Sequence, residues 1–157
     1  MDDVTVTRAI HILAVIHWMA GVAFGTAGVL PAIAAIAEPS SRLALFEAIE
    51  RRFSAQVKVS VPVAGLSGAY MVERLDVWNR FLMPEGWWLA AMAIVWLIFM
   101  VILFIVEPFV LHDWFHRRAT ADPAGTFRFV QRAHWGLLTA GTATAAAAVL
   151  GAHGLLG

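Results

Sequence analysis

The chain has 157 residues, of which 61% are hydrophobic and only 14% are charged, and its formal net charge is zero. Soluble domains carry about 45–50% apolar and about 25% charged residues, so this composition is typical of an integral membrane protein. A zero net charge gives no electrostatic reason to expect nucleic-acid binding. Because the sequence has no cysteine, disulfides, Cys-ligated iron–sulfur clusters and covalently attached c-type haem are excluded.

Four stretches are apolar and long enough to be membrane spans, which need about 20 residues. The first covers about residues 10–37, and the second, about residues 53–72, is the weakest because it contains Lys58. The third covers about residues 87–106 without a charge, and the fourth about residues 129–156. We therefore predict an all-α integral membrane protein, a four-helix bundle in which the whole chain, residues 1–157, forms one transmembrane domain.

The region around the second span contains further predicted features. Ser40 or Ser41 is suited to cap a short amphipathic helix over about residues 41–52. Lys58 lies within reach of one interface, so we expect its ammonium group to snorkel into the headgroup region there.

The distribution of basic residues predicts the orientation of the four spans. Four spans place both termini on one side of the membrane and the loops after the first and third spans on the other. The second side carries eight basic residues and the terminal side three: Arg42, Arg51, Arg52, Lys58, Arg117, Arg118, Arg128 and Arg132 against Arg8, Arg74 and Arg80. By the positive-inside rule, the loops after the first and third spans are then cytoplasmic and both termini are periplasmic, in a bacterial inner membrane. Glu107 is expected to pair with an inner-side arginine, such as Arg132.

Four of the six histidines lie inside the predicted spans: His11, His17, His134 and His153. An ionisable side chain in a span is costly and is by default a functional hypothesis, and imidazole is the usual protein ligand of haem iron. Two axial ligands of one iron must lie at similar depth. At 1.5 Å rise per residue, His11 and His153 both lie near the outer ends of their spans. We therefore predict one outer-side haem b, bound non-covalently between them.

The other two histidines have less defined roles. His17, roughly 9 Å deeper on the first span and about 120° round the helix from His11, replaces it as a ligand if that span is kinked. His134 lies about 28 Å further toward the cytoplasm than His153 and is suited to a second, inner site. The Arg51–Arg52 pair would there hold either lipid phosphate or haem propionates. The alternative is that these histidines only form hydrogen bonds with neighbouring backbone or hydroxyl groups.

A second type of site is predicted at the end of the third span. His112 and His116 are four residues apart with Asp113 between them, so they share one helix face and could bind a divalent metal. The same residues lie where the span leaves the bilayer, and a solvated interfacial cluster is the alternative that we favour there.

Small and aromatic residues surround the histidines. Gly21 and Gly25 follow His17, and such small residues allow either a flat porphyrin or a neighbouring helix to approach the backbone. Close helix packing of this kind would also favour a homodimer. Trp18 and Trp135 each follow a histidine directly and either line a cofactor site or face lipid.

The segment from Ala9 to Gly21 reads AIHILAVIHWMAG and resembles the first helix of the bacterial HemJ and CopD-like membrane families. FEAIERRF and the proline-containing span after it resemble their second helix, and LHDWFHRR and FRFVQRAHW occupy the places of later HemJ motifs. The resemblance implies a four-helix haem-binding membrane protein in which His11 is functional. HemJ-type proteins are implicated in oxidising protoporphyrinogen IX, and CopD-like proteins in copper handling. The chain departs from HemJ because the lysine of the third span is absent and the N-E-x-P segment is replaced by Gln131–His134.

The first functional hypothesis is a transmembrane b-type cytochrome-like protein that transfers electrons at the outer side of the membrane, with quinone or another small molecule as redox partner. It would be a possible haem-dependent oxidoreductase embedded in the lipid bilayer. The second hypothesis is a HemJ-like protoporphyrinogen IX oxidase. The third is a non-enzymatic metal-handling or packing subunit, which would bind no haem and would hold metal through His112 and His116.

Overall fold

The computed structural model describes residues 3–111, 117–118 and 120–155, and this part of the chain is all-helical, without a β-strand. The prediction of an all-α fold is confirmed. The elements are α1 (Asp3–Phe24), η1 (Gly25–Val29), α2 (Leu30–Ile36), α3 (Arg42–Arg74), η2 (Trp78–Leu82), η3 (Pro84–Gly86), α4 (Trp87–Val101), η4 (Ile102–Leu111) and α6 (Pro123–Ala152). Of the short elements, η1 and η4 are π-helical, whereas η2 and η3 are 3₁₀-helices.

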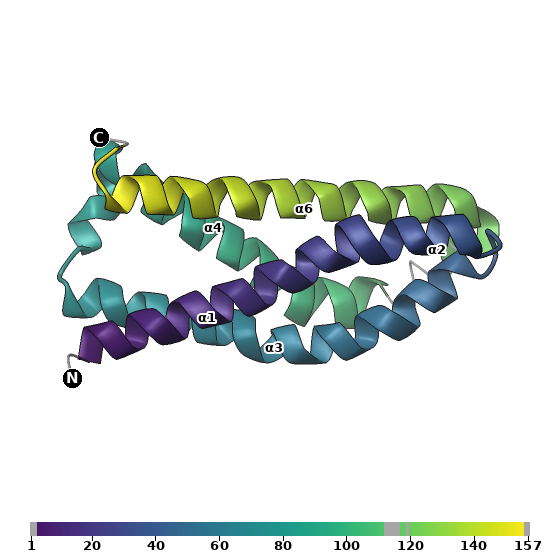
Figure 1. Cartoon of the computed structure of the whole chain (residues 1–157), viewed down its shortest axis with the longest axis horizontal. Coiled ribbons are helices and arrows are strands. Elements are labelled where there is room, and N and C mark those ends of the chain that lie inside the picture. The colour runs from purple at the N-terminus through teal and green to yellow at the C-terminus, as the bar shows by residue number, and fades with distance from the viewer. Residues whose placement is uncertain (1–2, 112–116, 119, 156–157) are drawn as a thin grey trace.

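The long helices lie side by side along the longest axis of the molecule, and the N- and C-termini are at the same end (Figure 1). Helix α1 packs against α3 and α6, and α4 packs against the same two helices. Helices α3 and α6 also contact each other, so they lie at the centre of the packing.

Three helical segments are long and apolar enough to cross a membrane: Asp3–Ile36, Pro84–Phe109 and Pro123–Ala152. They correspond to the predicted first, third and fourth spans, although the first and fourth spans were predicted to end at residues 37 and 156. Helix α3 is not among them: within its predicted span, Lys58, Gln56, Pro62 and several serines and glycines lower the mean hydropathy of the helix. The second span therefore stays a prediction.

Helix α3 differs from its predicted form. The amphipathic helix expected over residues 41–52 and the span expected over residues 53–72 form one continuous helix, Arg42–Arg74. Ser41 is at its N-cap position, but its side chain makes no capping hydrogen bond. The backbone carbonyl of Ser41 instead accepts the N–H of Leu45 at 3.0 Å. A capping hydroxyl is therefore not what starts this helix.

Two prolines accompany the π-helical segments. Proline has no N–H to donate within a helix, and its ring displaces the preceding turn. Pro31 is the second residue of α2, two residues after the end of η1, and Pro108 lies within η4. In both places the helix continues past the proline, and the π-helical turns lie before Pro31 and around Pro108. Such π-helical turns are frequent at functional sites.

Helix α6 begins and ends earlier than predicted. The span expected over residues 129–156 is a helix from Pro123 to Ala152. Asp122 caps its start by accepting the N–H of Gly125 at 2.8 Å, and Pro123 occupies the first turn, where a missing N–H costs nothing. His153 therefore lies in the turn after the helix and not within it.

Three groups of buried residues hold the interior together; the smallest joins α4 and α6 and consists of Trp88, Leu89 and Ala147, and the two larger ones surround the site. One joins α2, α3 and α6 and consists of Leu30, Ile33, Leu43, Phe46, Phe127 and Val130. The other joins α1, α3, α4 and η4 and consists of Trp18, Val22, Val57, Val61, Phe99 and Leu103. Phe46 from the first group and Trp18 from the second line the same cavity, which therefore lies between the two groups.

Candidate functional site

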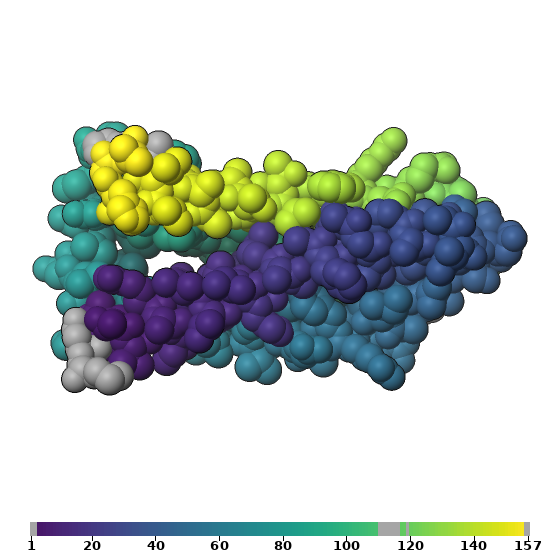
Figure 2. All heavy atoms as spheres, in the orientation of Figure 1, coloured from purple at the N-terminus to yellow at the C-terminus, as the bar shows by residue number. Residues whose placement is uncertain are grey.

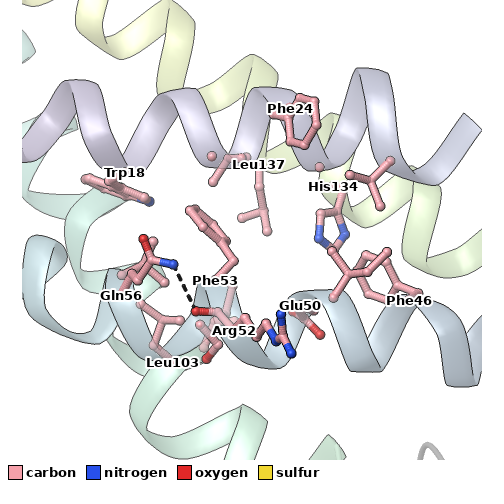
Figure 3. A pocket seen from close by; sticks show the side chains of 18 of the residues that line it. Trp18, Phe24, Phe46, Glu50, Arg52, Phe53, Gln56, Leu103, His134 and Leu137 are labelled. Atoms are coloured by element: carbon pink, nitrogen blue, oxygen red, sulfur yellow. Dashed lines mark hydrogen bonds between the residues drawn. The ribbon is translucent and has the colours of Figure 1, made fainter. Parts of the chain in front are cut away.

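A cavity of about 630 Å³ lies between the helices and is mainly apolar. Its aromatic walls come from α1, α3 and α4, and Figure 3 shows Trp18 at one end, His134 at the other and Phe53 between them. The aromatic lining residues are Trp18, Phe24, Phe46, Phe53 and Phe99. An apolar cavity with a few polar groups is the usual form of a cofactor or small-molecule site.

Two glycines of the first span line this cavity in different ways. A Cβ placed on Gly25 would meet no atom within 4 Å, so this glycine leaves open space. A Cβ on Gly21 would overlap the ring of Phe53, so the glycine allows that ring to lie against the backbone of α1. Of the two predicted roles for these residues, Gly21 serves helix packing and Gly25 widens the cavity.

Of the four histidines in the predicted spans, His134 is the one that lines the cavity. Its Nδ1 lies 3.0 Å from the carbonyl oxygen of Val130, and its ring meets the ring of Phe46 edge-on at 5.3 Å between centroids. Because a carbonyl can only accept, Nδ1 must carry the hydrogen. In the neutral imidazole the lone pair is then on Nε2, the nitrogen that remains for a metal.

Trp18 gives the cavity an unusual polar atom. Its side chain is 5% exposed, and its Nε1 is buried without a hydrogen-bond partner in the described part of the chain. A buried donor without a partner is costly, by about 1–3 kcal/mol, and calls for an explanation such as a bound ligand. The sequence left open whether Trp18 lines a cofactor site or faces lipid, and the structure places it in the cavity wall. Trp135, for which the sequence left the same two alternatives open, is half exposed.

Polar side chains of α3 form one side of the cavity. Glu50, Arg52, Ser54 and Gln56 all line it, and the amide of Gln56 donates to the carbonyl of Arg52 at 3.2 Å. Figure 3 shows Glu50 and Arg52 on the same side of the cavity, with Arg52 pointing away from α1. Arg52 is exposed, so its guanidinium is available to an anionic group at the edge of the cavity.

His11 faces α3 rather than α6. Its Nδ1 lies 2.8 Å from the carbonyl oxygen of Ala64 and 3.2 Å from the hydroxyl of Ser67, and its ring packs close to the backbone at Gly68. This matches the alternative of a histidine that bonds to backbone and hydroxyl groups. It also fixes Nδ1 as the protonated nitrogen, since the carbonyl can only accept.

His153 is exposed at the end of α6, with Nδ1 at 2.7 Å from the carbonyl oxygen of Val149. Within the described ranges, no hydrogen bond or ring contact joins it to His11. In Figure 2 the surfaces of the first turns of α1 and the last turns of α6 do not meet. The predicted ligand pair therefore lies on two separated helix ends, and its role in binding haem stays a prediction.

His17 lines a shallower groove between α1 and α3, of about 370 Å³. Its Nε2 lies 3.4 Å from the side-chain oxygen of Gln56, and Gln56 lines both this groove and the main cavity. His17 is thus separated from His134 by the cavity wall. The predicted metal pair, His112 and His116, lies outside the described residues. Among the residues that are described, no group of three or more potential ligands is arranged to hold a metal ion.

The sequence missed a polar cluster between α3 and η4. Glu107 was expected to pair with an arginine such as Arg132, which is wrong, because its carboxylate pairs with Lys58. That Lys58 extends to an interface stays a prediction. The Lys58 ammonium lies 2.9 Å from Glu107 Oε1, and the Ser54 hydroxyl lies 2.7 Å from each oxygen of the same carboxylate. The contact of Ser54 and Lys58 with Glu107 could be predicted only from how α3 and η4 pack against each other.

A second cluster ties the helix ends together where the termini lie. Asp3 Oδ2 accepts from Tyr70 at 2.8 Å and from Arg74 at 2.9 Å, which joins the start of α1 to the end of α3. Because the cluster is exposed, it fixes how α1 and α3 align along their lengths more than it stabilises the fold.

These features define an all-helical protein with three helices that are long and apolar enough to cross a membrane and with an internal, mainly apolar cavity. The chain matches no model of a known protein family, no curated protein and no solved structure.

Proposed function

We propose that this chain is a membrane protein that binds haem b non-covalently and uses it in electron transfer, with the cavity beside His134 as the haem site. The observation that carries the proposal is that one intramembrane histidine lines a cavity of about 630 Å³ whose walls are largely aromatic and aliphatic. The site then belongs to α6, α3 and α1, and not to the outer ends of α1 and α6.

The side chains around the cavity are suited to a flat, apolar ligand with anionic edges. His134 offers Nε2, and its bond to the Val130 carbonyl holds the ring in one tautomer, as outer partners of ligating histidines commonly do. The buried Nε1 of Trp18 lacks an acceptor that a ligand could supply. Arg52, at the edge, suits a carboxylate. Bound haem would supply one-electron chemistry, while these residues would set its position and exclude water.

The site would lie in the cytoplasmic half of the membrane. About 27 Å of helix separates His134 from Ala152, the last residue of α6, at 1.5 Å per residue. In this proposal all four long helices, including α3, cross a bacterial inner membrane as a bundle with both termini in the periplasm. The excess of basic residues at the opposite end supports that orientation.

The outer pair, His11 and His153, remains the other candidate for haem. It would require the end of α6 to approach α1, because His11 bonds to α3 and His153 is exposed. Protoporphyrinogen oxidation is a further candidate, since the cavity that suits haem has walls equally suited to its tetrapyrrole precursor. Rescue of a cell that lacks this oxidase would favour the enzyme over the electron carrier.

Absorption spectroscopy of variants would test the site. We expect the protein to show a Soret band that shifts on reduction with dithionite, and His134→Ala to abolish it. His11→Ala and His153→Ala are matched controls, since each removes an intramembrane histidine outside the cavity, and we expect both to retain the band. Retention in His134→Ala, with loss in the two controls, would assign haem to the outer pair and refute the cavity site.

A cavity-filling variant adds a test that leaves every histidine in place. Because a side chain at position 25 meets open space, Gly25→Leu should fold while it occupies part of the cavity. We expect its haem content to fall. Normal haem content in a folded Gly25→Leu protein would show that the ligand is bound elsewhere.

A further inference from the structure

The groove between α1 and α3 contains a buried hydroxyl group without a hydrogen-bond partner. Ser60 lines this groove, which has a volume of about 370 Å³, and the residue is 9% exposed. Within the described ranges, its Oγ makes no hydrogen bond. A buried polar group without a partner is costly and calls for an explanation such as a bound ligand.

Ser60 differs from the other buried serines of α3 in how its hydroxyl is used. A serine inside a helix can donate to the carbonyl four residues before it, and Ser67 does so, at 2.6 Å from the oxygen of Val63. Ser54 donates instead to Glu107 of η4. In the described part of the chain Ser60 makes neither kind of bond. Its hydroxyl is therefore available to a molecule in the groove.

Two further polar side chains line the groove together with Ser60. His17 Nε2 lies 3.4 Å from the side-chain oxygen of Gln56. Because an amide oxygen can only accept, this contact places the hydrogen of His17 on Nε2 and leaves the lone pair on Nδ1. A hydroxyl donor and an imidazole acceptor therefore line one groove. The other lining residues are apolar: Ile10, Leu13, Ala14, Val59 and Val63.

The groove lies far from the outer ends of the two helices. Arg74, at the end of α3, bonds to Asp3, at the start of α1, so the helices run antiparallel from this contact. Ser60 is fourteen residues before Arg74, and His17 is fourteen residues after Asp3. At 1.5 Å per residue, both lie about 21 Å along their helices from the contact. They are therefore level with each other and deep in a hydrocarbon core about 30 Å thick.

Depth and polarity together select among the apolar molecules of a bilayer. An acyl chain fits the apolar walls but has no oxygen that could accept from Ser60. The ester and headgroup oxygens of a phospholipid stay at the surface of the hydrocarbon core. An isoprenoid quinone enters the core and carries two carbonyl oxygens on its ring. One carbonyl can accept from Ser60, and a hydroxyl of the reduced quinol can donate to Nδ1 of His17.

We propose that the groove between α1 and α3 binds the ring of a membrane-soluble quinone, with Ser60 and His17 as its polar contacts. The ring lies beside the main cavity, because Gln56 lines both the groove and the cavity. Figure 3 shows Gln56 at the end of the cavity where Trp18 lies. The role of the quinone as electron partner of the haem rests on the proposed function, whereas its binding to the groove does not.

Photolabelling of the whole protein in lipid nanodiscs would locate the quinone. The probe is a photoreactive azido derivative of decylubiquinone, and labelled peptides are identified by mass spectrometry. We expect labels within residues 10–17 and 56–63, and their loss when excess decylubiquinone is added. Labels only on residues 46–50, which contribute to the main cavity, would overturn the proposal. So would the absence of any label that decylubiquinone displaces, because the groove would then hold lipid chains.

A pair of serine variants tests the polar contact. Ser60→Ala removes the unpartnered hydroxyl, and Ser67→Ala removes a buried hydroxyl of the same helix outside the groove. We expect Ser60→Ala to bind decylubiquinone about fivefold more weakly than the wild type, which corresponds to one hydrogen bond, and Ser67→Ala to stay within about twofold. Equal affinities of the two variants would contradict the role of Ser60.

A pair of tryptophan variants tests the space in the groove. Leu13 is 66% exposed at the groove, and Leu66 is 72% exposed on α3 outside it. Because both positions are exposed, both variants should fold. We expect Leu13→Trp to lose decylubiquinone binding and Leu66→Trp to retain it. Unchanged binding by folded Leu13→Trp protein would show that the quinone is bound elsewhere.

His134→Ala separates the quinone site from the proposed haem site. We expect this variant to lose the Soret band and to bind decylubiquinone as the wild type does. Quinone binding by wild-type protein that contains no haem would support the groove and reject only the haem proposal. Haem in a protein that binds no quinone would reject only the groove. Loss of quinone binding in folded His134→Ala would place the quinone in the main cavity and overturn the proposal.

Discussion

Gly21 and Gly25 provide a matched pair of substitutions that tests the packing around the cavity. The two glycines are one helical turn apart, and each is replaced by alanine. Each replacement raises the free energy of unfolding by about 0.5–1 kcal/mol, because alanine loses less backbone entropy than glycine in a helix. The new methyl group at position 21 overlaps the ring of Phe53, whereas at position 25 it meets open space. Only Gly21→Ala therefore forces a neighbour to move.

The magnitude follows from that difference. Overpacking of a well-packed site costs about 1–3 kcal/mol, and the gain from helix propensity is common to both variants and cancels between them. We expect Gly21→Ala to be less stable than Gly25→Ala by about 1–3 kcal/mol, with Gly25→Ala at least as stable as the wild type. The ring of Phe53 would be displaced toward the cavity, so Gly21→Ala should also bind less ligand.

Reversible unfolding of the purified protein in mixed micelles, by titration with sodium dodecyl sulfate, would measure both free energies of unfolding. A wild-type sample in the same detergent is the reference. Equal stabilities of the two variants to within about 0.5 kcal/mol, or a greater loss for Gly25→Ala, would refute the packing of Phe53 against α1 and the open space beside Gly25.

Three further predictions concern single contacts. Lys58→Met should lower the free energy of unfolding by about 1–3 kcal/mol. This is less than for a fully buried ion pair, because Lys58 and Glu107 are both about one-third exposed. In a double-mutant cycle with Glu107→Gln, purely additive losses would contradict a direct interaction between the two side chains. Trp96→Phe should cost about 1 kcal/mol in the same unfolding titration, because the indole donates to the Val61 carbonyl at 2.8 Å beside Pro62, and an unchanged stability would speak against that bond. Asp122→Ala should remove the cap of α6 and cost about 1 kcal/mol, seen as a lower Tm in detergent, whereas an unaltered Tm would show that α6 starts without it.

The helical fold could be predicted from the sequence because long apolar stretches leave few alternatives in a membrane. The uncharged third span and the alanine-rich fourth span each contain a helix that the structure confirms as apolar enough to cross a membrane. The limits of these helices were less predictable. The helix over residues 42–74 is continuous because the turn between residues 51 and 54 has no helix-breaking residue, although its composition changes there from charged to apolar.

The candidate site could be predicted only in part. Sequence reasoning selected His134 as an inner histidine, but it preferred His11 and His153 because they lie at similar depth; angles around a helix could be compared only within one helix. Depth does not determine the direction of a side chain around its helix. The bond from His11 to Ala64, and the meeting of Lys58 with Glu107, depend on how separate helices rotate and pack, and that information is long-range.

The position of Trp18 in the cavity wall was only weakly indicated by the sequence. Trp18 directly follows His17, and it is buried partly against Phe99 in α4, whose ring lies edge-on at 4.6 Å between centroids. A tryptophan in a span is common at interfaces, so the residue type alone could not place it in a cavity wall.

The haem content of the purified protein tests the central claim most directly. The protein would be purified from haem-replete cells, and haem and protein would be quantified in the same sample, alongside His134→Ala prepared in parallel. We predict about one haem per wild-type chain, since one intramembrane histidine lines the cavity, and little or none in the variant. Colourless wild-type protein, or equal haem in the wild type and in His134→Ala, would contradict the account.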